Sequence, residues 1–466
     1  MHIPRPEIEE LPPIKGERRN KLYIRYKYSP GRYFLFSAIT LRFWNVQIMN
    51  PHIPRRTMFR KRFALGAGLA AVLLLSPLAP PALAAETVKT ITLATWGSSP
   101  AETAALADAI ATFQVRYPLI KVDLIIDTDH SAQMAAKFAA KSPPDVFYLD
   151  WGVAQDWINQ GVLYDLSSSI ASSNFNLTPF NKSYLKPFQS GGAIYGLPKD
   201  ANPLVLEGNK TLMAKAKIKA LPKTIKEFNM QAKLLLAKKI TPMCVDADLN
   251  RLGAFFVSFG GGISNASWTK SLLQSPQTKA AMNWVMNNYK SGAFRTPSQL
   301  SAGWAGEAFG KGKCAYTMEG AWIDPFLKDA FPSVFKSMIK APLPTAVHTG
   351  SLAFTAAYAI GKDSANKAEA WTFIQYMTGS RGMTIWTSQG VAIPSRSDVP
   401  TPLGYDVNAR VANDPYTVSP PAIIGWSKVI DAFNNKAKAS IQNKSFVPAK
   451  AAAAILSAAQ AAWPSA

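Results

Sequence analysis

The chain has 466 residues, with 51 Lys/Arg against 29 Asp/Glu and a formal net charge of +22. This length is sufficient for two α/β lobes with sizeable cores. After residue 85 the basic residues are dispersed rather than grouped in runs, which excludes a basic tail of the nucleic-acid-binding kind and indicates a solvated surface.

The first 57 residues do not have the pattern of a domain. They contain 11 Lys/Arg against 4 Glu, with tyrosines and phenylalanines scattered among them. A basic, aromatic segment of this kind is able to bind nucleic acid. The residues that follow favour another interpretation, in which 1–57 is upstream sequence from a misassigned start.

A secretory signal peptide is predicted over 58–84. Its basic start precedes an apolar run of 13 residues, Phe63–Leu75, and a small-x-small cleavage site stands at 82–84. The apolar run is too short to span a bilayer comfortably. A start at Met49 is the alternative, and it would add Arg55-Arg56 as a weak twin-arginine signal.

The remaining chain, about 85–466, is still basic. Removing the 11 and 3 Lys/Arg of the two leading segments from 51, and their 4 Glu from 29 acidic residues, leaves 37 against 25, a net charge near +12. This balance is compatible with an acidic ligand, an acidic habitat or docking to an acidic partner.

Strands and helices are predicted to alternate in the first part of this chain. Strands are expected at 89–96, 121–126 and 145–149, and helices at 101–117, 131–140 and 153–160. In the first helix, one apolar stripe is formed by Leu106, Ile110, Phe113 and Tyr117. This β-α-β-α-β-α order predicts a parallel sheet covered by helices.

Two tryptophans follow strands at the same edge of this predicted sheet. Asp150-Trp151-Gly152 follows the third strand, and Trp96 ends the first. A pyranose has flat C–H faces that pack on an indole ring, and hydroxyls that bond to carboxylates. A Trp beside an Asp, with a glycine that clears space, therefore predicts a sugar site. The alternative is two tryptophans of the core.

The stretch 304–322 is the most informative part of the second half. It predicts a short helix, a Gly-Lys-Gly-Lys turn, a strand and the start of a second helix. Glu319 and Trp322 lie at the carboxyl end of this strand, where open α/β sheets bind ligands. The alternative is a core strand with a buried Trp. Further helices are expected at 224–239, 252–259, 279–289, 364–378 and within 426–463, and a further strand at 353–360.

These segments together resemble the family 1 extracellular solute-binding proteins, the maltose-binding-protein-like sugar receptors of ATP-binding-cassette (ABC) importers. The helix, Gly-Lys-Gly turn, strand and Gly-x-Trp end of 304–322 are similar to a pattern of this family. Other segments resemble its first strand, second site segment, crossing between lobes, late helix and Gly-x-x-x-Pro turn: 91–97, 143–152, 195–200, 368–380 and 390–395. The match covers about residues 86–466, and its order and spacing are specific.

The resemblance implies an α/β, two-lobed periplasmic-binding-protein-like fold of type II. Each lobe is then a mainly parallel sheet covered by helices, with the ligand cleft between the lobes. Lobe one is expected to comprise 86–198 and 353–400, and lobe two 199–348 and 405–466. The chain departs from the family at Glu207-Gly208, where an aromatic pair is common.

The resemblance also implies that both lobes contribute ligand-binding residues. Those expected are Trp96, Asp150, Trp151, Asp200, Asp248, Arg251, Glu319, Trp322 and Trp426. Asp248 stands at a helix start and is alternatively a cap. Arg251 would bind a ligand carboxylate or sugar hydroxyls, or else pair only with Asp248. Cys244 and Cys314 fall on strand-like segments of lobe two, and form either one disulfide or two buried thiols.

The implied function is capture of a carbohydrate and its delivery to the membrane permease of an ABC importer. The protein is expected to be an exported monomer in the periplasm or at the cell exterior. Ala85-Glu86 stand where the family often has a lipid-modified Cys, so no such anchor is expected. Alternatives are an exported glycoside-active enzyme with paired carboxylates such as Asp150 and Glu319, and a ligand sensor for a signalling receptor.

Enzymatic and cofactor motifs are absent from the sequence. The mature region has only His130 and His348, neither near a cluster of Cys or Glu, which argues against a zinc site and a Ser-His-Asp triad. The sequence also lacks a P-loop, a dinucleotide fingerprint and a Gly-x-Ser-x-Gly motif. We therefore expect no enzyme, no cofactor, no metal and no nucleic acid partner.

Overall fold

The computed structural model describes residues 7–10, 24–27, 87–97, 99–388 and 390–464. The chain divides into two units, 1–82 and 83–466. Two short strands of the first unit, β1 (Glu7–Glu10) and β2 (Ile24–Lys27), form an antiparallel pair. Most of the predicted upstream segment, and all of the signal peptide at 58–84, lie outside the described residues, so both stay predictions.

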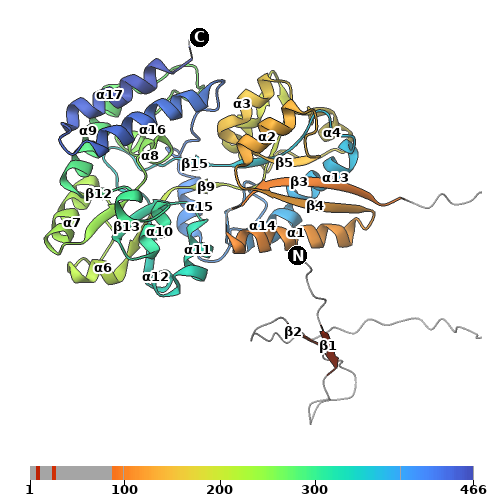
Figure 1. Cartoon of the computed structure of the whole chain (residues 1–466), viewed down its shortest axis with the longest axis horizontal. Coiled ribbons are helices and arrows are strands. Elements are labelled where there is room, and N and C mark those ends of the chain that lie inside the picture. Colours follow the sequence, from red (N-terminus) through yellow and green to blue (C-terminus); the bar gives the residue numbers. More distant parts are fainter. Residues whose placement is uncertain (1–6, 11–23, 28–86, 98, 389, 465–466) are drawn as a thin grey trace, which may run out of the picture. The chain divides into compact units, whose positions relative to one another are not determined.

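Two five-stranded sheets form the framework of the second unit, each in its own lobe (Figure 1). The first has the order β4 (Ile120–Asp127), β3 (Lys89–Trp96), β5 (Val146–Asp150), β16 (Ala356–Ile360), β8 (Leu197–Pro198). Strand β3 is parallel to β4 and β5, whereas β16 is antiparallel to both of its neighbours. All strands except β16 therefore run in one direction.

The second sheet repeats this pattern of strand directions. Its order is β12 (Phe294–Arg295), β11 (Thr241–Cys244), β13 (Cys314–Glu319), β10 (Val205–Asn209), β14 (Met338–Ala341). Strand β11 is parallel to β12 and β13, and β10 is antiparallel to β13 and β14. The predicted mainly parallel sheet is thus confirmed in both lobes, with one reversed strand in each.

Helices cover both faces of the first sheet because its central strands β5 and β16 are buried on both faces. On one face lie α1 (Pro100–Arg116), α13 (Lys367–Met377) and α14 (Ser380–Ser388), and on the other α2 (His130–Ala139) and α3 (Trp151–Asn159). Ser99 caps α1 and Pro100 opens it, as both residue types favour. The predicted helices of this lobe are confirmed with their ends moved by at most three residues, and the strand expected at 353–360 forms two short strands, at 353–354 and 356–360.

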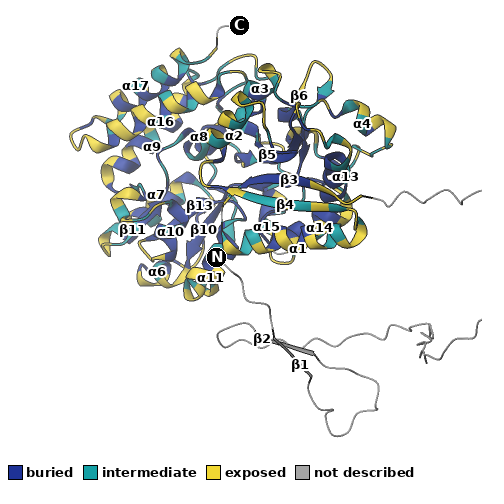
Figure 2. Cartoon of the chain, turned by 45° about the vertical axis from the view of Figure 1, so that its right-hand side comes forward, coloured by how far each residue is buried: buried dark blue, intermediate teal, exposed yellow. Residues whose placement is uncertain are grey.

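The second sheet is covered in the same way. One face carries α7 (Ile225–Ala237), α8 (Leu249–Ser258), α9 (Pro276–Ser291), α16 (Trp426–Gln442) and α17 (Pro448–Ala461), and the other α10 (Ala305–Gly310) and α11 (Ile323–Ala330). Figure 2 shows the strands buried beneath helices whose outer faces are exposed. Residues 304–322 form the predicted helix, turn, strand and helix start.

Short elements complete the described part of the chain. They are α4 (Ser167–Ser172), α5 (Lys182–Leu185), α6 (Lys210–Lys215), α12 (Pro332–Ser337), α15 (Asp406–Ala412), β6 (Gln189–Ser190), β7 (Ala193–Ile194) and the 3-10 turns Lys186–Phe188 and Ser298–Leu300. No helix among the described residues combines the length and the apolar character that crossing a bilayer requires.

A narrow ribbon of chain connects the two lobes. Strand β9 (Asn202–Pro203) pairs antiparallel with β15 (Ala353–Phe354). Val418 runs beside β15: its carbonyl accepts from the Ala353 N–H at 3.0 Å, and its own N–H donates to the Ser351 carbonyl at 3.0 Å. The expected boundaries of the lobes, at 198/199, 348/353 and 400/405, stay predictions.

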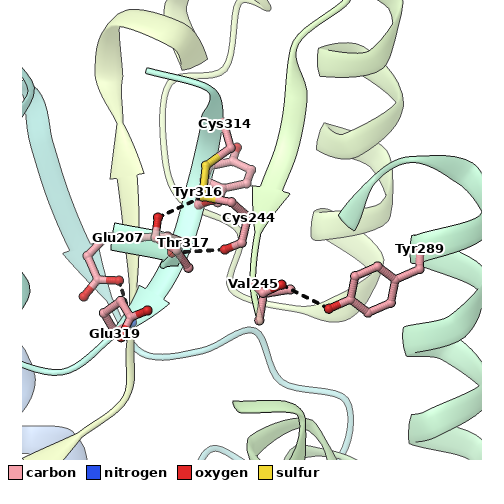
Figure 3. Close-up of a disulfide and its surroundings, with 9 residues drawn as sticks. Glu207, Cys244, Val245, Tyr289, Cys314, Tyr316, Thr317 and Glu319 are labelled. Carbon is pink, nitrogen blue, oxygen red and sulfur yellow. Dashed lines mark hydrogen bonds between the residues drawn. A yellow bond between two sulfur atoms is a disulfide. The ribbon is translucent and has the colours of Figure 1, made fainter. Parts of the chain in front are cut away.

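A disulfide joins Cys244 of β11 to Cys314 of β13 (Figure 3). The two strands are parallel neighbours, and both cysteines are completely buried beneath α10 and α11. Of the two alternatives for this pair, the structure has the bonded one. Cys314 stands at the start of β13 and Glu319 at its end, so the disulfide supports the strand that leads to the candidate site.

Candidate functional site

Two adjoining pockets lie between the sheets and share Asp150, Trp322 and Phe354. We call the first, of about 260 Å³, the Arg251 pocket; its other lining residues are Trp151, Gly152, Val153, Asn250, Arg251, Ser427 and Ile430. We call the second, of about 280 Å³, the Lys199 pocket; its other lining residues are Trp96, Glu102, Lys199, Asp200, Asn202, Thr355, Ala356 and Val391. Residues of both lobes and of the connecting ribbon therefore surround one site.

The carboxyl ends of three strands, two of the first sheet and one of the second, lie at this site. Trp96 ends β3, Asp150 ends β5, and Glu319 ends β13, three residues before Trp322. The carboxyl end of a parallel sheet is where open α/β folds bind ligands, because loops and helix starts converge there. The sequence-based prediction of two Trp at one edge is correct for Trp96 and Trp151.

Glu319 organises the side of the site that belongs to the second lobe. It is completely buried, and its Oε2 accepts hydrogen bonds from Arg251 Nη2 at 2.8 Å and from Trp322 Nε1 at 3.0 Å. Burial raises the pKa of Glu319, and the Arg251 guanidinium counteracts that rise. The ion pair fixes the rotamers of both lining side chains before any ligand arrives.

Arg251 stands between charged and aromatic groups. Its guanidinium carbon lies 5.6 Å from the ring centroid of Trp322 and 5.9 Å from that of Phe354. Its Nε is buried and has no hydrogen-bond partner within the described residues, and the same holds for Glu319 Oε1. Because Arg251 lines a pocket and Glu319 lines neither, Arg251 Nε is the candidate for a water or ligand contact.

Glu207 supports the Arg251–Glu319 ion pair from behind. It is the residue at which the sequence departs from the aromatic pair that is common in the family. It is completely buried, and its Oε2 accepts the backbone N–H of Glu319 at 3.0 Å (Figure 3). Burial raises the pKa of Glu207 well above its usual range. The residue thus ties β10 to the end of β13 and does not line either pocket.

Asp150 is the polar centre of the first lobe's side. It caps α3, because its Oδ1 accepts the Gly152 N–H at 2.7 Å. Burial raises its pKa to about 6, and the bond from Gly152 opposes the rise. A Cβ at Gly152 would stand 3.0 Å from Asp150 Oδ1, so a glycine is needed for this close approach. The glycine thus makes room for the cap on α3, and its expected role of clearing space for a sugar stays a prediction.

The Lys199 pocket contains a second buried ion pair. Lys199 Nζ donates to Asp200 Oδ2, and Trp386 Nε1 donates to the same oxygen at 3.4 Å. Lys199 Nζ also lies 4.3 Å from the Trp386 ring centroid and 4.7 Å from that of Tyr148. Aromatic rings thus surround the ammonium group, and its charge is already paired.

The nine predicted residues divide into those that line the pockets and those that support them. Six line the pockets: Trp96, Asp150, Trp151, Asp200, Arg251 and Trp322. Glu319 stands behind Arg251 and Trp322. Asp248 caps α8 through the Arg251 N–H at 2.8 Å, so the backbone of Arg251 bonds to Asp248 while its guanidinium pairs with Glu319. Trp426 is completely buried behind Trp151, with ring centroids 6.2 Å apart.

The lining residues that sequence reasoning did not name as site residues include Glu102, Lys199, Asn202, Asn250 and Phe354. Lys199 and Asn202 belong to the predicted crossing, where polar residues were expected to face the cleft, so a signal for them was present. Asn250 lies between two predicted site residues. Glu102 stands in the first turn of α1, where an acidic residue usually complements the helix dipole, and its sequence position carried no signal.

A separate pocket of about 400 Å³ is less suited to a polar ligand. It is lined by Lys186, Trp268, His348, Tyr416 and neighbouring residues, without a carboxylate among them. Its aromatic faces are already occupied, since Lys186 Nζ lies 3.8 Å from the Trp268 ring centroid and His348 stacks on Tyr416 at 4.1 Å. Within the described residues, no group of three or more His, Cys, Asp or Glu could hold a metal ion.

The positions of Asp150 and Glu319 also test whether they could act as the paired carboxylates of a glycoside-active enzyme. A glycoside hydrolase needs an acid and a nucleophile or base that both face the scissile bond. Asp150 lines both pockets, but Glu319 lines neither, and its Oε2 is held by Arg251 and Trp322. The pair therefore does not have the arrangement that such hydrolysis requires.

Comparisons with known proteins agree with this picture. The family model described as bacterial extracellular solute-binding protein matches residues 96–384. An ABC substrate-binding protein of Listeria monocytogenes, solved with cycloalternan, is 22% identical with a TM-score of 0.70 over 80% of this chain and 98% of that chain. A solute-binding protein of Thermotoga lettingae, bound to α-D-tagatose, is 19% identical. Its TM-score is 0.70, and the match covers 81% of this chain and 100% of that chain.

A third solved structure has the same architecture. The maltotriose-binding protein of Thermus thermophilus, bound to maltotriose, is 20% identical with a TM-score of 0.66 over 80% of this chain and 99% of that chain. At these identities the likeness shows the fold, and it confirms the predicted two-lobed α/β architecture.

Proposed function

Because the chain belongs to the bacterial extracellular solute-binding proteins, we propose that it captures a carbohydrate between its two lobes and delivers it to an ABC importer. The chain is a binding protein of this family and not an enzyme. The ligand class, the delivery step and export to the periplasm or cell exterior belong to the proposal, as does the monomeric state.

The observation that carries the proposal is the composition of the two adjoining pockets. Trp96, Trp151, Trp322 and Phe354 supply aromatic surface, and carboxylate, amide and guanidinium groups stand between them. Sugar rings present apolar C–H faces and a rim of hydroxyls, and they need both kinds of surface at once. The relatives described above were solved with cycloalternan, α-D-tagatose and maltotriose, which supports the same class of ligand.

Calorimetric titration with mono- and oligosaccharides, amino acids and metal ions tests the proposal. We expect saturable binding of at least one saccharide. Binding of amino acids or metals together with silence across the saccharides would contradict it. Release of reducing ends from the bound saccharide would instead favour the glycoside-active alternative. Loss of uptake of that saccharide in a host that lacks the protein would support delivery to an importer rather than a sensor role.

Trp322→Ala is expected to weaken saccharide binding roughly 10- to 100-fold, since burial of an aromatic side chain contributes about 1.5–3 kcal/mol. Trp322 lines both pockets and its Nε1 is held by Glu319, so its ring is preorganised for stacking. Calorimetry with the saccharide found above measures the change. Trp268→Ala is the matched control, because it removes the same side chain outside both pockets. Equal affinities of Trp322→Ala and the parent would remove Trp322 from the site.

A further inference from the structure

Asp150 occupies the junction of the Arg251 pocket and the Lys199 pocket. It lines both pockets, together with Trp322 and Phe354. One of its oxygens, Oδ1, is used by the Gly152 N–H at 2.7 Å. The hydrogen bond from Gly152 is the one that the described residues make to this carboxylate, which leaves Oδ2 for a ligand. A ligand that occupies both pockets therefore lies beside Asp150 Oδ2, which is able to accept a hydrogen bond from it.

The cations of the site are not available to a ligand in the same way. Arg251 is paired with Glu319 at 2.8 Å, and Lys199 is paired with Asp200. Both acidic partners are buried, so a ligand carboxylate could reach either cation only by competing with a desolvated ion pair. Asp150 has no such countercharge, and Glu102 adds a further carboxylate to the lining.

The volumes of the two pockets indicate a ligand that is large enough to fill both. Each pocket, at about 260 and 280 Å³, is smaller than the roughly 300–1,000 Å³ of ordinary small-molecule sites, and only the two together reach this range. Trp151 lines only the Arg251 pocket, Trp96 lines only the Lys199 pocket, and Trp322 lines both. This arrangement offers aromatic surface to two successive rings.

We propose that Asp150 determines the ligand class: the site takes an uncharged saccharide of at least two linked units, which donates a hydroxyl to Asp150 at the junction, and it rejects acidic sugars. This inference rests on the proposed carbohydrate function and deepens it. The net charge near +12 of the mature chain then has no relation to the ligand, because the site itself carries more acidic than basic groups.

The pH dependence of affinity distinguishes neutral from acidic ligands by its sign. The pKa of Asp150 is raised to about 6 by burial. A hydroxyl donates more strongly to a carboxylate than to a carboxyl group, so a neutral saccharide should bind more weakly as the pH falls through 6. An acidic saccharide should bind more tightly over the same interval, because protonation removes the negative charge that repels it.

Other titratable groups must be separated from Asp150 in this measurement. The charged groups that face it across the two pockets are Glu102 on α1, Lys199 and Asp200 before β9, and Arg251 on α8. Asp246, outside both pockets, also has its pKa raised to about 6, mainly by burial. Asp150→Asn therefore tests the inference, and Asp246→Asn is the matched control. Asn is itself a good helix N-cap, so the first variant should fold.

The experiment is calorimetry one pH unit above and one below 6, in buffers of different ionisation enthalpy. The probes are maltose, cellobiose and mannobiose, with their monosaccharides and the corresponding disaccharides that carry a uronic acid. We expect a neutral disaccharide to bind with proton release and about tenfold more tightly at the higher pH. Asp150→Asn should weaken this binding about tenfold and abolish its pH dependence, while Asp246→Asn retains the dependence.

Three results would overturn the inference. The first is tighter binding of the uronic acid disaccharide than of its neutral counterpart, and the second is equal pH dependence in the parent and Asp150→Asn. The third is equal affinity for a disaccharide and its monosaccharide, which would remove the two-unit ligand. Any of these leaves carbohydrate binding intact. Failure of every saccharide would overturn the proposed function itself, and the inference with it.

Discussion

Glu319→Ala is expected to lower the free energy of unfolding by about 3–5 kcal/mol, the cost of leaving one member of a buried ion pair without its partner. Glu319 is completely buried, and the Arg251 side chain is 19% exposed. The substitution leaves the guanidinium without its hydrogen-bonded countercharge and Trp322 Nε1 without an acceptor. Saccharide binding should fall below detection, because both side chains line the site. Urea unfolding and calorimetry measure the two effects.

Two further variants separate loss of charge pairing from loss of bulk. In the double variant Glu319→Leu with Arg251→Met, apolar side chains replace both charges, so stability should return close to that of the parent while binding stays absent. Glu307→Ala on α10 removes a half-exposed partner of Lys311 and of the Gly303 N–H, and should lower the unfolding midpoint much less than Glu319→Ala does. If Glu319→Ala unfolds at the parent's urea concentration, the ion pair does not contribute to stability as we infer.

Loss of the disulfide is expected to lower the free energy of unfolding by about 4 kcal/mol in the chain-entropy model. The bond joins residues that are 70 positions apart, so it restricts a long loop of the unfolded chain. The change is Cys244→Ala together with Cys314→Ala, and chemical denaturation with and without reductant measures it. We expect the parent in reductant to unfold at nearly the same denaturant concentration as the double variant in its absence.

The double variant supplies its own control, because reductant has no disulfide left to break there and should not shift its midpoint. Saccharide affinity under conditions where the variant is folded should stay close to that of the parent, since neither cysteine lines a pocket. If the parent unfolds at the same denaturant concentration with and without reductant, the disulfide does not stabilise the protein by lowering the conformational entropy of its unfolded chain.

The elements of the fold were predictable because each follows from local pattern. The apolar stripe of α1, with Leu106, Ile110 and Phe113, is buried as its period of 3.6 residues predicts. The continuous apolar run before Asp150 forms a strand buried on both faces, as parallel strands covered by helices require. The reversal of β16 was not predicted from local pattern, because nothing within its five residues encodes the direction of its neighbours.

The site was only partly predictable, because pairing over long distances in the sequence decides which groups are available. Arg251 was expected to pair with a ligand or with Asp248, three residues away, but its guanidinium partner is Glu319, 68 residues away. Asp248 could equally cap its helix or face the ligand, and only the fold separates these roles. Trp426 has the residue type of a sugar platform, yet it packs behind Trp151.

The reversed strand of the first sheet sets the order in which that lobe can be completed during synthesis, because β16 is the last of its strands in the chain. In the first sheet, β16 pairs with β5 on one side and β8 on the other. A chain that emerges with its N-terminus first therefore exposes the edge of β5, which ends at Asp150, until residue 356 has appeared. Exposed strand edges invite pairing with other chains. Fragments that end before Ala356 should accordingly aggregate rather than fold as an independent lobe.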